Sequence, residues 1–339
     1  MTHMERIGAT LAGQERDRVP YGLVTSVFGA RLADLPLADY FSQPELYVRG
    51  QRAAVALLDP DVVFTPFLFA YHAAAFGAPV GAQPQAAPNV GKPPYSTVAA
   101  ALEVPLPDPY KDAGLGYLLG AARAMAAEYG GQRLLVAPLI APVDLPILLI
   151  GMENWLDALL FDKAAAAALA EKCLEHFRGM AEAYAAAGVN MLSCPVMMAN
   201  PELLDMDNLR KLALPILHQA FAFSPVPLVF HHGGNRLSGS LSLYTNLPNL
   251  AGFLLSPQDS LDAARKEAGP DCLLLGNISG PHFDAYGVDG VQRQVEALLH
   301  SMRGDQRWML CSSGAELPWR TDPAVLEAVK QVIARSAYE

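Results

Sequence analysis

Residues 251–280 read AGFLLSPQDSLDAARKEAGPDCLLLGNISG. Two short apolar runs, 251–256 and 272–277, stand on either side of a stretch with helical spacing, 260–269. Apolar runs that do not alternate with polar residues are typical of strands buried on both faces of a parallel sheet. This segment therefore predicts one strand–helix–strand unit of an α/β protein.

The same alternation extends along the whole chain. Eight strands are predicted, over residues 19–27, 61–67, 133–139, 189–195, 227–232, 251–256, 272–277 and 307–313. The clearest helical patterns cover residues 44–58, 155–187, 201–222, 260–269, 288–302 and 322–335. Asn200-Pro201 and Thr321-Asp322-Pro323 supply a capping side chain followed by proline, as helix starts do.

Eight such units indicate a (β/α)₈ barrel, and a doubly wound open sheet is the alternative. Pro and Gly, 27 of each, are scattered rather than pooled in a linker. We therefore expect a single barrel domain over residues 1–339, with an N-terminal helical extension.

The charge balance excludes several classes of partner. Lys and Arg number 24 against 34 Asp and Glu, a net charge of -10, and no basic run is present. This disfavours binding to nucleic acid or to an anionic membrane surface. The apolar run 134–151 is interrupted by Pro138, Pro142, Asp144 and Pro146, so no membrane span is predicted.

The four cysteines are far apart and the N-terminus is charged where a secretory signal would be apolar. We therefore expect a reducing, cytoplasmic location.

In such a barrel the chemistry is expected where strands end and the following loops begin. The segment 231–235, His-His-Gly-Gly-Asn, follows one strand, and alternation along a strand predicts that only one of the two histidines faces the barrel mouth. The other candidates at strand ends are His72, Cys194, Asn200, Asn277, Cys311 and Glu316. For Asn277 an ordinary turn, for Glu316 a solvated loop, and for the cysteines a place in the core are the alternatives.

Zincin, α/β-hydrolase and P-loop motifs are absent from the sequence. Taken together, several segments resemble the uroporphyrinogen decarboxylase superfamily, which also contains corrinoid-dependent methyltransferases. The segments are ERIGATLAGQERDRVPYG, DPDVVFTPFLFAYHAAAFGAPV, PLVFHHGGN, GFLLSPQDSLDAARKEAGPDCLLLGNISG and SSGAELPWRTDPAVLEAVKQVI. The resemblance implies a (β/α)₈ barrel with its site at the carboxyl ends of the strands.

The decarboxylase pattern of this superfamily is incomplete here. Its Arg-rich R-Q-A-G-R-Y stretch, which neutralises substrate carboxylates, corresponds to a region with only Arg31. The Asp of its F-S-D motif falls on Pro66, and the His of its G-H-G motif falls on Ala315. Decarboxylation of a tetrapyrrole is therefore disfavoured.

The methyltransferase pattern is closer but lacks its thiolates. The resemblance implies zinc held by H-x-C-G-N and G-C-E-I-P, and here the two cysteines are replaced by Gly233 and Ala315. One remaining His does not hold zinc, so we predict a site without metal. A relocated metal site made of Cys194, His231 and Cys311 is the alternative.

The resemblance implies a methyltransferase that moves a methyl group between a corrinoid, delivered as methylcobalamin on a separate partner protein, and a small molecule. Tetrahydrofolate is the expected small molecule because a pterin needs no zinc. We expect His231 or Glu316 to transfer the proton, and the remaining candidates to contact substrate: His72, Cys194, Asn200, Asn235, Asn277 and Cys311. A decarboxylase acting on a tetrapyrrole or a smaller carboxylate, and a catalytically silent relative that binds a tetrapyrrole or corrinoid, are the alternatives.

Overall fold

Parallel strands follow one another around a barrel in the computed structural model of the protein, which describes residues 1–314 and 316–336. Their order is β1-β11-β9-β8-β7-β6-β5-β2, and the Asp61 amide donates to the Tyr21 carbonyl (2.9 Å) where β1 meets β2. The strands are β1 (Tyr21–Gly22), β2 (Val62–Phe64), β5 (Leu134–Pro138), β6 (Met191–Pro195), β7 (Leu228–His231), β8 (Leu250–Leu254), β9 (Leu273–Leu275) and β11 (Trp308–Ser313). Each predicted segment overlaps one of them, so the predicted (β/α)₈ barrel is confirmed and the open sheet is wrong.

Three short strands add to this arrangement. β3 (Val80–Gly81) and β4 (Asn89–Val90) form an antiparallel pair, and β10 (Ile278–Ser279) pairs with the end of β11. They were not predicted because each has only two residues, too few for a periodic pattern.

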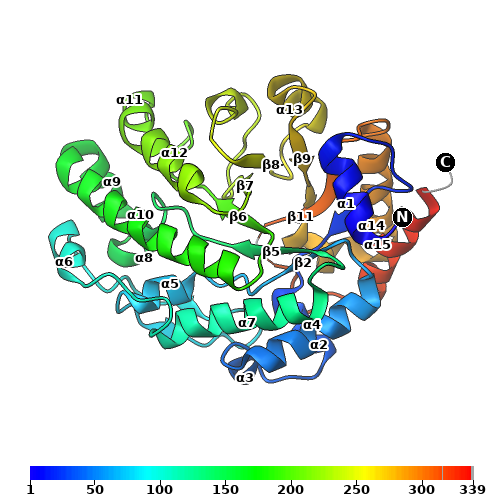
Figure 1. Ribbon diagram of the computed structural model, residues 1–339, viewed down its shortest axis with the longest axis horizontal. Helices are drawn as coiled ribbons and strands as arrows, with labels where there is room; N and C mark the ends of the chain where they lie inside the picture. The colour runs from blue at the N-terminus through cyan, green and yellow to red at the C-terminus, as the bar shows by residue number, and fades with distance from the viewer. Residues whose placement is uncertain (315, 337–339) are drawn as a thin grey trace.

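Helices surround the strands, and α1 lies on the same side of the molecule as α14 and α15 (Figure 1). The helices are α1 (His3–Ala12), α2 (Ser26–Leu32), α3 (Leu37–Tyr40), α4 (Pro44–Leu58), α5 (Ala70–Ala75), α6 (Val98–Glu103), α7 (Ala113–Tyr129), α8 (Leu145–Ile150), α9 (Met152–Phe161), α10 (Lys163–Ala186), α11 (Met206–Asn208), α12 (Leu214–Phe223), α13 (Leu261–Ala268), α14 (Phe283–Ser301) and α15 (Pro323–Ser336), with η1 (Leu209–Ala213), η2 (Leu241–Leu243) and η3 (Gly280–His282). Within the described residues, no helix combines the length and the apolar character needed to cross a bilayer.

Two predicted helices are divided in the structure. The 155–187 pattern spans α9 and α10, which separate at Asp162, whose side chain accepts from the Ala165 amide (3.1 Å). In the 201–222 pattern, residues 201–204 form a turn, and the helical part starts only after Asp205. The predicted cap at Asn200 is therefore wrong, because its Oδ1 accepts from the Glu202 amide (2.8 Å) within a turn. The Asp322 cap of α15 is confirmed by its bond to the Ala324 amide (2.9 Å).

The interior of the barrel is filled by apolar side chains, and helix α1 adds one of its own. Ile7 of α1 packs with a cluster of inward-facing strand residues that includes Val62, Leu134, Met191 and Met309. The predicted N-terminal extension is thus a helix in contact with the barrel interior. A second and larger apolar core lies between the strands and the outer helices.

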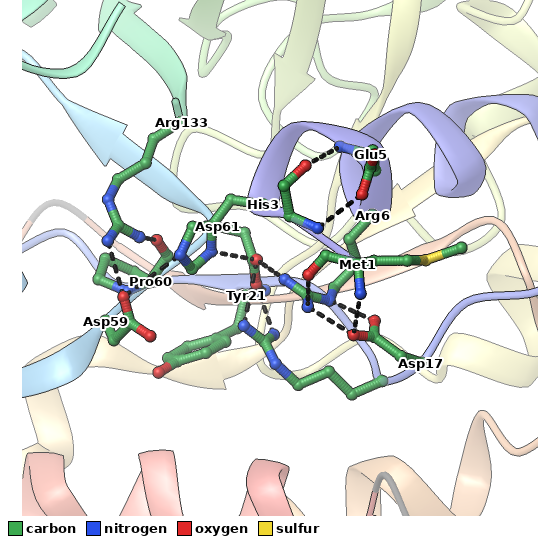
Figure 2. A network of polar contacts seen from close by, with 12 residues as sticks. Met1, His3, Glu5, Arg6, Asp17, Tyr21, Asp59, Pro60, Asp61 and Arg133 are labelled. Atoms are coloured by element: carbon green, nitrogen blue, oxygen red, sulfur yellow. Dashed lines mark hydrogen bonds and ion pairs between the residues drawn. The ribbon is translucent and has the colours of Figure 1, made fainter. Parts of the chain in front are cut away.

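A buried carboxylate, Asp61, joins α1 to the start of β2 (Figure 2). It accepts from His3 Nδ1 (2.8 Å), Arg6 Nη1 (2.5 Å), Arg18 Nη1 (2.6 Å) and the Tyr21 amide (3.0 Å). Burial alone would raise the pKa of Asp61, but the hydrogen bonds from His3 and Arg18 and the Arg18 charge outweigh it and lower the pKa. Asp61 is therefore a buried anion that is held by cations from the N-terminal segment.

We expect Asp61→Asn to lower the free energy of unfolding by about 3–5 kcal/mol, because two guanidinium groups would keep their charge without a buried counter-ion. Urea denaturation measures the change. Asp108→Asn is the control, since Asp108 pairs with Lys111 at the surface (2.9 Å), and it should leave stability unchanged. Equal effects of the two substitutions would contradict this assignment.

Candidate active site

The strands surround a cavity of about 30 Å³ inside the barrel, lined by residues from both ends of the strands. Its lining is almost entirely apolar. The side chains with a hydroxyl, imidazole or thiol group that line it are Ser193 of β6, His231 of β7, and Cys311 and Ser312 of β11. Phe67 and Val24, which follow β2 and β1, also line it. His231 and Cys311 are the two predicted site residues that the fold brings to this cavity.

His231 and His232 stack on each other, with ring centroids 4.5 Å apart and an angle of 15° between the planes. Of the two, His231 lines the cavity and His232 does not. β7 ends at His231, and the chain then turns through Gly233 (φ 62°) and Gly234 (φ 104°). Strand alternation therefore does not apply to this pair.

Both imidazoles are held in the same way, and both are buried. The Gly233 amide donates to His231 Nδ1 and the Gly234 amide donates to His232 Nδ1, each at 3.0 Å. The two Nε2 atoms are buried and have no hydrogen-bond partner among residues 1–314 and 316–336. Burial lowers the pKa of His231 well below its ordinary value and that of His232 to about 4. Both rings are therefore neutral at pH 7.

Glu316 follows β11, in the loop that runs against the start of α2, while its neighbour Ala315 lies outside the described residues. Burial raises the pKa of Glu316 to about 8, although the Ser26 hydroxyl and the Val27 amide bond to the carboxylate and oppose the change. Its Oε1 is buried without a partner in the described part of the chain. At pH 7 this side chain therefore carries a proton.

Ser26 connects Glu316 to the cavity. Its hydroxyl also accepts from the Phe67 amide (3.4 Å), and the Phe67 ring lies 6.2 Å from the His231 ring. A neutral acid and two neutral imidazoles are thus placed around one end of the barrel.

The three predicted asparagines hold loops together through their side-chain amides. Asn200 Nδ2 donates to the Arg236 carbonyl (2.9 Å), and Asn235 Nδ2 donates to the Met197 carbonyl (2.8 Å). Asn277 Nδ2 donates to the carbonyls of Ser256 (2.7 Å) and Asp259 (2.9 Å). These bonds shape the mouth of the barrel, and contact with substrate stays a prediction for all three.

His72 and Cys194 lie in the outer layer instead of the cavity. His72 Nδ1 meets His176 Nε2 of α10 at 3.0 Å, and Cys194 belongs to the core beneath the helices. Ser193, the residue before Cys194, faces the cavity, so Cys194 faces the other way. Cys194 therefore does not join His231 and Cys311 at the cavity, and the described residues contain no group of three or more potential metal ligands. The relocated metal site is wrong.

Sequence reasoning missed Asp144, because the sequence showed this residue only as an interruption of an apolar run. Its carboxylate accepts from the amides of Met197 (2.6 Å) and Met198 (2.8 Å) and so joins the loops after β5 and β6. Burial raises its pKa to about 7 against those two hydrogen bonds. A lone Asp just after a predicted strand was the signal that pointed to it.

Gly233 occupies the position where the methyltransferase pattern has a zinc-binding Cys. A Cβ atom there would lie 2.4 Å from the Val196 carbonyl carbon and 2.6 Å from the Met197 nitrogen. The backbone at Gly233 therefore has no room for a side chain. Because a catalytic zinc needs about three protein ligands, the described residues do not fit the zinc ion of the superfamily.

The uroporphyrinogen decarboxylase (URO-D) family model matches residues 2–336, so the chain belongs to this family. Among solved structures, a methyltransferase from Methanosarcina mazei is similar over 99% of both chains, with 19% identity and a TM-score of 0.86. Endo-glycoceramidase II from Rhodococcus sp. covers 92% of this chain and 79% of its own, with 10% identity and a TM-score of 0.50. At these identities the likeness is one of fold. No curated protein matches the sequence.

We expect Gly233→Ala to cost about 1–3 kcal/mol more in unfolding free energy than Gly234→Ala, because only the former forces a methyl group into the backbone of the β6 loop. Gly234 has a positive φ too, but it has open space around its Cβ position. Urea denaturation of the two variants gives the difference. A zinc-dependent rise in the melting temperature of Gly233→Cys would contradict the account of this position.

Glu316→Gln should change how stability depends on pH. Between pH 4.5 and about 8 the unfolded chain has released the Glu316 proton and the folded protein retains it, so this group makes the free energy of unfolding fall as pH rises. Gln removes the contribution, so the variant should gain stability relative to the wild type from pH 5 to pH 8. Asp144 acts in the same direction up to about pH 7 in both proteins and cancels in the comparison. A difference that is constant across this range would refute the burial of a protonated Glu316.

Proposed function

We propose that this protein transfers a methyl group between a corrinoid carried by a partner protein and a small molecule, by a route that uses no zinc. The observation that carries the proposal is Glu316, a buried acid with a free Oε1 and a pKa of about 8. When cobalt(I) takes a methyl group from nitrogen or oxygen, that atom leaves with the bonding electron pair and needs a proton. Glu316 is protonated at pH 7 and supplies it.

The surroundings of Arg31 argue against the decarboxylase alternative. Arg31 Nη1 donates to the carbonyls of Trp319 and Thr321, both at 2.5 Å, so this guanidinium is engaged by the backbone. A tetrapyrrole carries many carboxylates, and its recognition requires free cations. A substrate with fewer negative charges fits this site better.

Tetrahydrofolate is the small molecule that we propose, because methylation and demethylation at N5 need only a proton and correct placement. His231 and His232 are neutral and near the same cavity, and in this proposal they orient the substrate while Glu316 moves the proton. When the transfer runs from corrinoid to tetrahydrofolate, the proposed methyl donor is methylcobalamin held by a cytoplasmic corrinoid protein.

The proposal predicts that the purified protein, free of zinc, converts cob(I)alamin to methylcobalamin when 5-methyltetrahydrofolate is added. Absorbance of the two cobalamin forms follows the reaction. Glu316→Gln should slow it about 10²- to 10⁴-fold at pH 7, and the wild-type rate should fall above pH 8 as Glu316 loses its proton. Glu202→Gln, the same change at an exposed position of a mouth loop, is the control and should leave the rate unchanged.

Three results would contradict the proposal. A rate that appears only when zinc is added, with coenzyme M as the methyl acceptor, would indicate the metal route. Tight corrinoid binding without turnover would favour the silent relative. Isothermal titration that shows no binding of tetrahydrofolate would exclude the pterin.

A further inference from the structure

The two stacked histidines carry information about where their protons lie. An amide N–H donates to Nδ1 of each ring, so Nδ1 must offer its lone pair. In a neutral imidazole the proton then lies on Nε2. His231 and His232 therefore each present an Nε2–H group, which is a donor and not a base.

These two donors are buried, since His231 and His232 are each only 4% exposed. Neither donor has a partner in the described residues. Burying an N–H group without an acceptor costs about 1–3 kcal/mol. Two such groups on consecutive residues, with rings 4.5 Å apart, are more than an isolated defect of packing. They are poised to bind an acceptor.

We propose that the Nε2–H groups of His231 and His232 form a donor pair that binds a carbonyl or negatively charged oxygen of the substrate. Two fixed N–H donors in a site shielded from water stabilise such an oxygen strongly, as in an oxyanion hole. His231 also lines the cavity inside the barrel, whose other walls are nearly all apolar. The apolar walls weaken competition from water and leave the imidazoles as the recognition element.

This inference deepens the proposed methyl transfer and rests on it for the identity of the ligand. The oxygen has two sources. In a pterin it is the ring carbonyl. In a methyl ether it is the atom that leaves: cobalt(I) supplies the electron pair of the new Co–C bond, the C–O bond breaks, its pair stays on oxygen, and Glu316 then protonates that oxygen.

The first test is the tautomer itself. Nitrogen-15 NMR of the full chain labelled at histidine should show His231 and His232 as neutral Nε2–H tautomers at pH 7. Addition of 4-nitrophenolate, which presents a charged oxygen, should move both Nε2–H proton signals downfield. A proton on Nδ1 of either ring would overturn the donor pair, without any variant having to fold.

The second test is affinity, measured by titration with 4-nitrophenolate and with 4-nitroaniline, which has the same ring without the charged oxygen. His231→Leu and His232→Leu should each weaken phenolate binding about 10- to 100-fold and leave aniline binding unchanged. His231→Gln, whose amide restores a donor, should recover most of the affinity. His218→Leu, at an exposed position of α12, is the control.

Competition identifies the source of the oxygen. Displacement of the phenolate by tetrahydrofolate supports the pterin carbonyl, and displacement by 2-methoxyphenol supports the ether. If the Leu variants bind phenolate as the wild type does, the donor pair is wrong while methyl transfer can still stand. If phenolate binds as expected and no methyl donor alkylates cob(I)alamin, the proposed function is wrong and the donor pair remains.

Discussion

The carboxylate of Asp61 has no contact with solvent, and it accepts hydrogen bonds from three side chains of the N-terminal segment. His3 and Arg6 belong to α1, and Arg18 precedes β1. The same carboxylate accepts from the Tyr21 amide, and the Asp61 amide donates to the Tyr21 carbonyl. One residue therefore holds β1 against β2, which is where the ring of strands closes, and it anchors the helix that contacts the barrel interior. A buried charge of this kind requires all its partners, so the N-terminal segment and the barrel depend on each other.

The opposite end of the barrel differs, because not all of its buried polar groups are paired. There the buried polar groups have spare capacity: two imidazole Nε2 atoms and one carboxyl oxygen lack partners within the described residues. Around them, Asp144, Asn235 and the other asparagines satisfy backbone groups and hold the loops in place. Rigid loops with unsatisfied groups at their centre are what a preorganised binding site needs.

The strands were predictable because burial on both faces makes each one an uninterrupted apolar run, and every predicted run overlaps a strand. Their lengths were less predictable. The run 19–27 contains a strand of only two residues, because the chain turns into α2 at Ser26 and thereby brings Ser26 and Val27 to Glu316. The helix predicted over 201–222 was interrupted because Asp205 caps a later start and Pro215 has no amide to donate.

The sequence by itself determined the barrel, its family and the absence of a cysteine at position 233, since these depend on residue type and order. Only the tertiary structure decided what the polar residues do. Position along the chain put His72, Cys194 and His231 in the same category, at or after a strand end. Strand alternation, helix packing and the turn at Gly233 then placed Cys194 and His72 in the outer core and left His231 beside His232. Protonation state, tautomer and spare hydrogen-bonding capacity depend on neighbours distant in sequence, so they follow from the fold and not from a motif.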